Sequence, residues 1–253
     1  MNTIGTATAY LVGLDLGERV DFTALSVLRQ HAVPTGRTVR SQVGFSRDEG
    51  MVYDTVPELE YQYDLIFLDR WRGRGYKAAV PIVAELLQEL RQESHRQRLA
   101  ANILNTPDVP VWVLADETGV GVPVVEDLRA AGLVCTGIVI TGGDTWSQTG
   151  QGFRVPKQAL VSTLRVLVEN HRISVSDALP LGSVLEAELQ NFRVKTKLTT
   201  GNESYGAGAG DLWREGAHDD LVLSVAMACW FGEHCLSDDE SDEVIESMNA
   251  ELA

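Results

Sequence analysis

The chain has 253 residues, a formal net charge of −15 and 44% apolar residues, which is enough for one large domain with a substantial core. No run approaches the roughly 18 consecutive apolar residues of a membrane-spanning helix, and the N-terminus lacks the basic-then-apolar order of a secretion signal. The cysteines form no CxxC pair, which argues against a disulfide framework or a thiolate zinc site. We therefore expect a cytoplasmic protein without a membrane segment.

The acidity of the chain lowers the expectation of nucleic-acid binding, because phosphate contacts need Lys and Arg. Part of the charge is local: residues 237–253 are rich in Asp and Glu and contain no Lys or Arg. This tail is predicted to be disordered. Basic residues cluster at 70–77 and alternate at 193–197. Nucleic acid thus stays possible as a ligand, with weak and salt-sensitive binding expected in the absence of a partner.

The predicted elements begin with two β-rich runs, 10–16 and 22–28, around a short turn, and a third apolar run at 65–68. This pattern is typical of an antiparallel meander. Apolar residues then recur at helical spacing over 77–101. The remaining expected elements are, in order, a strand at 111–115, a turn at 118–121, a helix at 122–131, a strand at 133–141, a glycine-rich loop or hairpin at 142–155, a helix at 157–171, a short extended run at 172–175, a helix at 184–191 and a strand at 192–200.

Residues 202–217 are flexible by composition, and 221–231 form a helix that is apolar nearly all round and therefore buried. An antiparallel start followed by strand–helix alternation predicts an α/β fold: a mixed sheet, first antiparallel and then parallel, with helices on both faces. We expect an N-terminal extension at 1–9, one domain at 10–236 and the acidic tail at 237–253.

Three stretches place an aspartate at the edge of an apolar run: VGLDLG at 12–17, VLADETGVG at 113–121 and HDDLVLSVAMACW at 218–230. Each aspartate alone has an ordinary explanation, as a turn residue, a helix N-cap or a favourable charge in a first turn. Together, however, they would meet at one end of the sheet. Carboxylates gathered in this way are what a hard divalent cation needs, so a metal-dependent phosphodiesterase is the favoured hypothesis.

Further stretches accompany these three, namely LIFLD, RGRGY at 72–76 and FRVPKQALVSTLRVLVEN at 153–170. With them, residues 10–232 resemble the nuclease domain of the large terminase subunit of tailed bacteriophages, in the ribonuclease H-like superfamily. The resemblance implies a ribonuclease H-like mixed sheet, two Mg²⁺ or Mn²⁺ ions, and endonuclease cleavage of double-stranded DNA during viral genome packaging in the host cytoplasm.

The resemblance also implies roles for individual acids. Asp15, Asp116 and Asp220 would bridge the two metal ions. Asp219 and Asp21 would be auxiliary acids that bind or orient the second metal or its waters.

Two basic side chains complete the implied site. His218 would orient a carboxylate or assist proton transfer, and its alternative is a histidine satisfied at a helix start. Lys157 would contact the scissile phosphate, and its alternative is a solvated surface lysine.

The chain departs from a full terminase large subunit because it contains no GxxxxGK[ST] loop, which an ATPase motor needs. The expected partners are therefore double-stranded DNA, an ATPase on a separate chain or a missing domain, the portal and the small terminase subunit. Met1 mildly favours a separately encoded nuclease over an excised domain. The alternatives are a Holliday-junction resolvase, an actin-like ATP-binding protein suggested by GLDLG, and a noncatalytic DNA-binding module.

Overall fold

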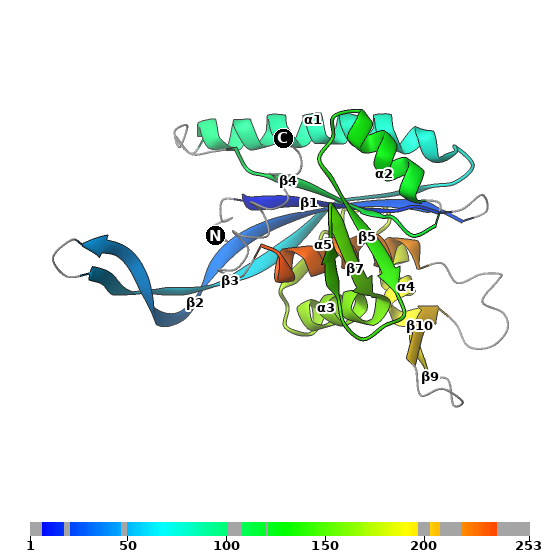
Figure 1. Ribbon diagram of the computed structural model, residues 1–253. Coiled ribbons are helices and arrows are strands. Elements are labelled where there is room, and N and C mark those ends of the chain that lie inside the picture. The colour runs from blue at the N-terminus through cyan, green and yellow to red at the C-terminus, as the bar shows by residue number, and fades with distance from the viewer. Residues whose placement is uncertain are drawn as a thin grey trace.

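The computed structural model describes residues 7–17, 21–46, 50–100, 108–119, 121–196, 203–207 and 219–236. Within these ranges a mixed sheet lies between two layers of helices (Figure 1). The first layer comprises α1 (Ala79–Ala100), preceded by the 3-10 turn η1 (Tyr76–Ala78), and α2 (Gly121–Ala130). The second layer comprises α3 (Lys157–Glu169), α4 (Gly182–Asn191) and α5 (Asp220–His234).

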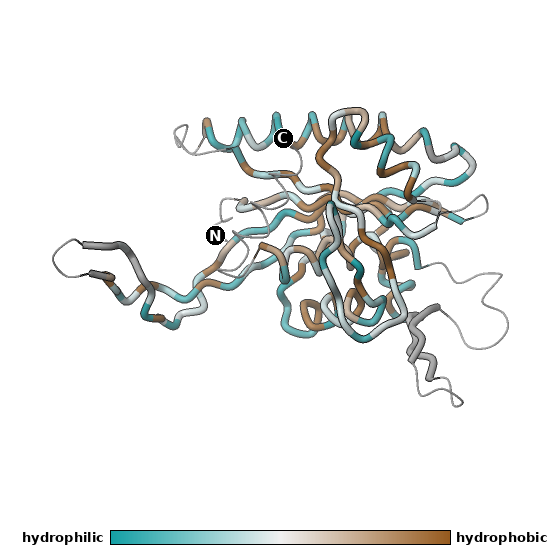
Figure 2. Tube along the Cα trace, in the orientation of Figure 1, coloured by the Kyte–Doolittle hydropathy of each residue, from teal (hydrophilic) through white to brown (hydrophobic). Residues whose placement is uncertain are grey.

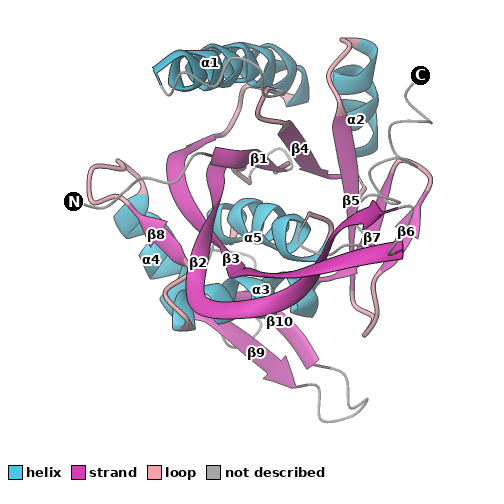
Figure 3. Cartoon of the chain, turned by 90° about the vertical axis from the view of Figure 1, so that its left-hand side faces the viewer, coloured by secondary structure: helices cyan, strands magenta, loops and turns pink. Residues whose placement is uncertain are grey.

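The described strands of this sheet run in the order β6-β7-β5-β4-β1-β2-β3-β8. Their bounds are β1 (Ala7–Asp15), β2 (Thr23–Ser46), β3 (Gly50–Trp71), β4 (Val111–Asp116), β5 (Cys135–Thr141), β6 (Ser147–Thr149), β7 (Gly152–Pro156) and β8 (Ile173–Val175). Strands β1, β2 and β3 pair antiparallel, and β1, β4, β5 and β7 pair parallel. With helices on both faces (Figure 3), this confirms the predicted α/β fold with a mixed sheet.

The largest difference from the sequence prediction is the length of β2 and β3. Each predicted run covers only the base of its strand, whereas the structure continues both as a hairpin that projects from the sheet (Figure 1). The side chains of residues 33–41 and 51–62 are half-buried or exposed, and they show no alternation of buried and exposed positions. Backbone pairing from Ala32↔Tyr61 to Ser46↔Gly50 forms this part of the hairpin instead.

After α4 the structure contains the strand predicted at 192–200 and one further strand that corrects the prediction. Strand β9 (Phe192–Thr196) pairs antiparallel with β10 (Glu203–Ala207), which lies inside the segment that composition marked as flexible. Strand β1 begins at Ala7, within the predicted extension at 1–9. The acidic tail at 237–253 lies outside the described residues.

The core divides into two apolar layers, one on each face of the sheet (Figure 2). Helix α5 is buried almost all round, as predicted, and lies against β1 and β2. A Cβ on Gly13 of β1 would come 1.9 Å from the carbonyl oxygen of Ser224 in α5. Only glycine therefore allows the helix backbone to rest directly on this strand.

The glycine-rich segment at 142–155 forms the predicted hairpin, β6 and β7. Its aromatic residue Trp146 packs edge-on against Phe153 and Trp230, with ring centroids 6.2 and 5.5 Å apart. The Trp146 and Phe153 rings therefore pack on the body of the protein.

No helix in the described part of the chain combines the length and apolar character needed to cross a membrane.

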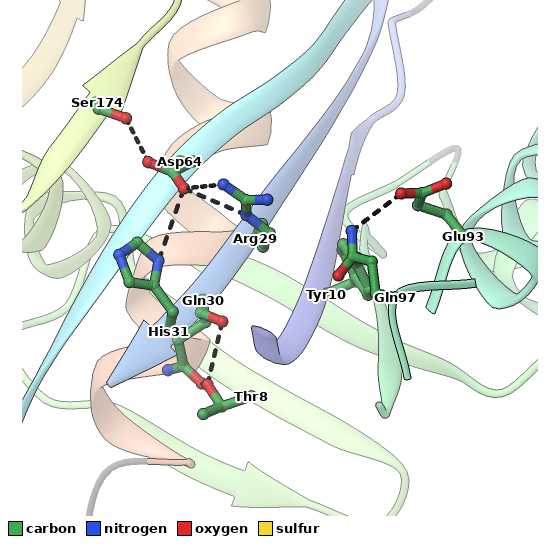
Figure 4. Close-up of polar contacts among 9 residues, drawn as sticks. All are labelled: Thr8, Tyr10, Arg29, Gln30, His31, Asp64, Glu93, Gln97 and Ser174. Carbon is green, nitrogen blue, oxygen red and sulfur yellow. Dashed lines mark hydrogen bonds and ion pairs between the residues drawn. The ribbon is translucent and has the colours of Figure 1, made fainter. Parts of the chain in front are cut away.

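A polar cluster joins the edge strand β8 to the base of the long hairpin (Figure 4). The Asp64 carboxylate accepts hydrogen bonds from Arg29 Nη2 at 2.6 Å and from Ser174 Oγ at 2.5 Å. Burial acts to raise the pKa of Asp64, but the Ser174 hydrogen bond and the Arg29 charge outweigh it and lower the pKa below its usual value. The ionised carboxylate thus stabilises the junction of β2, β3 and β8.

Replacing Asp64 with Asn should destabilise the protein, because the amide loses the charge that Arg29 pairs with. We expect a loss of about 1–2 kcal/mol and a fall in Tm of roughly 3–6 °C at pH 7. Since the pKa of Asp64 is lowered, its contribution is present above the ordinary Asp pKa and should fade as the pH falls below about 4.

The matched control for this measurement is Asp54→Asn, on the exposed part of the same hairpin, where the carboxylate accepts the neighbouring Thr55 N–H. Thermal unfolding followed by circular dichroism compares the two variants. Equal melting temperatures at pH 7 would contradict the stabilising role of Asp64.

Candidate active site at the carboxyl ends of the central strands

Two of the predicted acids end neighbouring parallel strands. Leu14 of β1 pairs with Ala115 of β4, so the next residues, Asp15 and Asp116, lie side by side at the same edge of the sheet. Asp15 is only 6% exposed. A Cβ on Gly121 would come 1.9 Å from the Asp116 carbonyl oxygen, so α2 starts directly against the end of β4.

The remaining acids come from the start of α5. Asp219 is the N-cap of this helix and Asp220 its first residue. Because α5 rests on Gly13, two residues before Asp15, its first turn lies near the end of β1. The charges of Asp116, Asp220 and Asp219 all act on Asp15. Folding therefore gathers carboxylates from three distant parts of the sequence, as predicted.

The protonation of these acids reflects burial and mutual repulsion. Burial is the largest cause that raises the pKa of Asp15 well above its usual value, followed by the charges of Asp116, Asp220 and Asp219. Burial, then Asp219 and Asp21, raise the pKa of Asp220 to about 7. Asp21 is thus close enough to interact with the site. The ionised cluster is costly without a compensating cation.

The pKa of Asp116 is raised less strongly than that of Asp15, because nearby groups stabilise its ionised carboxylate. Burial raises its pKa, and hydrogen bonds from Thr118 together with the charge of Lys157 oppose that effect. The Thr118 N–H donates to Asp116 Oδ1 at 2.8 Å. This bond also orients the carboxylate at the end of β4.

Lys157, the first residue of α3, points toward the acids. Its Nζ donates to Asp219 Oδ2 at 2.7 Å, and its charge lowers the pKa of both Asp15 and Asp116. Lys157 is therefore not a solvated surface lysine, because it forms a partly buried ion pair with Asp219. His218 lies outside the described residues.

The donor chemistry of the site fits a hard divalent cation. Its acids supply carboxylate oxygens, which suit Mg²⁺ and Mn²⁺, and concentrated negative charge, which a cation would relieve. Among the described residues, no three His, Cys, Asp or Glu side chains are arranged closely enough to form a ready-made metal cage. The described residues therefore suit a divalent cation in the type of their donor atoms and in their charge.

A buried acid next to the cluster, Glu188 of α4, was missed by the sequence analysis. Its Oε2 accepts the backbone N–H groups of Leu221 at 3.1 Å and Val222 at 3.3 Å, and its Oε1 accepts from Arg70 Nη1 at 3.1 Å. Burial first, and then the charge of Asp220, raise its pKa to about 7 despite these partners. The sequence could have indicated that Glu188 is buried, because it follows Leu185 by three residues and therefore lies on the same apolar face of the predicted helix.

Comparisons with known proteins give matches only among solved structures: no family model and no curated protein matches the chain. The large terminase nuclease from the thermophilic phage G20c is 22% identical, with 87% of this chain and 80% of that chain covered and a TM-score of 0.48. The nuclease domain of the bacteriophage SPP1 large terminase, solved with bound Mn, is 11% identical, with coverages of 89% and 86% and a TM-score of 0.43.

The HK97 bacteriophage large terminase is 18% identical with a TM-score of 0.42. That match covers 90% of this chain and 40% of that chain, so the present chain spans less than half of the larger protein.

Asp220→Asn should stabilise the metal-free protein at pH 8, because it removes a carboxylate that burial and repulsion disfavour. Because the pKa of Asp220 is raised in the folded protein, its ionisation lowers the stability of the wild type as the pH rises from about 4 to about 7. The variant should therefore melt at a higher temperature than the wild type at pH 8 and at the same temperature near pH 4. We expect a gain on the order of 1–3 kcal/mol at pH 8.

Asp127→Asn, on the exposed side of α2, is the control for a general loss of negative charge. Both variants are melted in EDTA across this pH range. A lower melting temperature for Asp220→Asn at pH 8 would refute the repulsive cluster.

Proposed function

We propose that this protein is a metal-dependent endonuclease that cleaves double-stranded DNA during viral genome packaging. The observation that carries the proposal is the convergence of Asp15, Asp116 and Asp220 at one edge of the sheet, each with a raised pKa. A protein keeps such a costly group of acids where a ligand compensates their charge. The substrate class rests on the terminase-like motifs around these same aspartates.

Asp15, Asp116 and Asp220 would hold two Mg²⁺ or Mn²⁺ ions, with Asp219 and Asp21 as auxiliary acids. When bound, the two ions supply a nucleophilic hydroxide at neutral pH and stabilise the leaving 3′ oxygen. The scaffold supports this arrangement because Asp15 is held by a buried strand and Asp116 is oriented by Thr118. His218 adjoins these acids in sequence, and we propose that it orients one of them.

The role proposed for Lys157 follows from its ion pair with Asp219. A cation bound by the acids competes with the lysine for the same carboxylate. The Lys157 ammonium group would then contact the scissile phosphate and stabilise the negative charge that develops there during cleavage.

Basic residues beside the acids offer a path for the DNA backbone. The guanidinium groups of Arg70 and Arg72 lie 4.4 and 5.1 Å from the ring centroid of Phe22. Because the chain as a whole carries a charge of −15, we expect its binding of DNA without a partner to be weak and salt-sensitive. We therefore propose that a packaging ATPase, together with the portal and small terminase subunit, delivers the DNA in the host cytoplasm.

The central test is cleavage of supercoiled plasmid with Mn²⁺. Asp15→Asn, Asp116→Asn and Asp220→Asn should each reduce nicking and linearisation by about 100-fold or more, because an amide replaces an anionic metal ligand. Asp127→Asn should cleave like the wild type, and EDTA should stop cleavage.

Undiminished cleavage by Asp116→Asn, or cleavage that persists in EDTA, would refute the proposal. A strong preference for four-way junctions over linear DNA would instead assign a resolvase. ATP binding would point to the actin-like alternative.

Lys157→Ala should slow cleavage by about 10- to 100-fold through the loss of a charge on the phosphate. Its Mn²⁺ affinity should be equal to or tighter than that of the wild type, because a competing cation is removed from Asp219. Arg165→Ala, on the exposed face of the same helix, is the matched control. Initial cleavage rates and calorimetric titration of Mn²⁺ separate the two effects, and unchanged cleavage would exclude a catalytic role for the lysine.

A further inference from the structure

The N-terminus of α5 is capped in an unusual way. An Asp at the N-cap position ordinarily accepts a hydrogen bond from the backbone N–H of the second or third helical residue. In α5 these donors belong to Leu221 and Val222, yet Asp219 makes no such bond. Its carboxylate accepts from Lys157 Nζ at 2.7 Å instead.

Both donors are taken up by Glu188 from a different helix. One oxygen of this single carboxylate lies 3.1 Å from the Leu221 nitrogen and 3.3 Å from the Val222 nitrogen. The other oxygen is held by Arg70 at 3.1 Å. Because Glu188 is only 6% exposed and its partner Arg70 stacks on Phe22, the carboxylate has a defined position between α4, α5 and β3.

We infer that Glu188 is a positioning residue: it caps α5 and thereby keeps the Asp219 carboxylate directed at Lys157 and the acid cluster. Without Glu188, two backbone donors in the first turn of a buried helix would lack their acceptor. The Asp219 side chain, at the N-cap, is the nearest replacement. Turning back onto its own helix would withdraw it from the site.

This inference rests on the proposed function, in which Asp219 contributes to a metal site. It adds a residue that contacts no metal and still sets the metal affinity. The effect depends on the acceptor oxygen of residue 188 rather than on its negative charge. A glutamine keeps an amide oxygen for the two backbone N–H groups and loses only the acceptor that Arg70 uses, so it should retain the cap on α5.

The first experiment compares Mn²⁺ binding by calorimetry in the wild type, Glu188→Gln and Glu188→Met. Methionine keeps the buried volume and removes the acceptor. We expect Mn²⁺ affinity at least tenfold weaker in Glu188→Met and within threefold of the wild type in Glu188→Gln. Wild-type affinity in a folded Glu188→Met protein would overturn the inference, whereas a wild type that binds no Mn²⁺ would overturn the proposed function.

A second measurement needs no Glu188 variant to fold and no metal. Asn caps a helix as well as Asp does and Ala does not, so Asp219→Ala and Asp219→Asn differ in capping while both remove the charge. If Glu188 is the cap, the two variants melt within about one degree of each other. An alanine variant several degrees less stable than the asparagine variant would show that Asp219 caps α5 and would overturn the inference.

Discussion

Helix α5 packs directly on strand β1, and both the core and the acidic residues are arranged around this contact. Gly13 has no side chain, so the Ser224 carbonyl lies where a Cβ would be. The sheet covers one side of α5 and helices α3 and α4 cover others, so α5 is apolar on nearly every side. The same contact brings the acidic first turn of the helix to the carboxyl end of β1. The absence of a side chain at Gly13 thus affects both the packing of the core and the position of the acidic residues.

The acids at this edge are unfavourable for the metal-free fold. Burial and mutual repulsion raise the pKa of Asp15 and Asp220, and the surrounding apolar layers offset that cost. Lys157 partly compensates the charge by pairing with Asp219. The acids are held together by two strand ends and one helix start, rather than by attraction among them.

Capping from a distance resolves a conflict between local and tertiary demands. The first turn of a buried helix needs hydrogen-bond acceptors, and the nearest side chain is Asp219, which instead pairs with Lys157. Glu188 meets the local demand from α4 with its position set by Arg70. Sequence analysis missed this because Glu188 and Leu221 are 33 residues apart, and nothing in a helical pattern indicates which side chain ends there.

The core elements could be predicted from the sequence alone, because apolar periodicity and turn residues are local properties. The sequence did not reveal the outer half of the long hairpin or strand β10, whose residues lack an apolar pattern and are held by backbone pairing. Only the tertiary structure decided that Asp15 and Asp116 are adjacent, that Lys157 pairs with Asp219, and that Glu188 caps α5. Each of these depends on strand register or on contact between elements far apart in the chain, and such contacts arise only when the core packs.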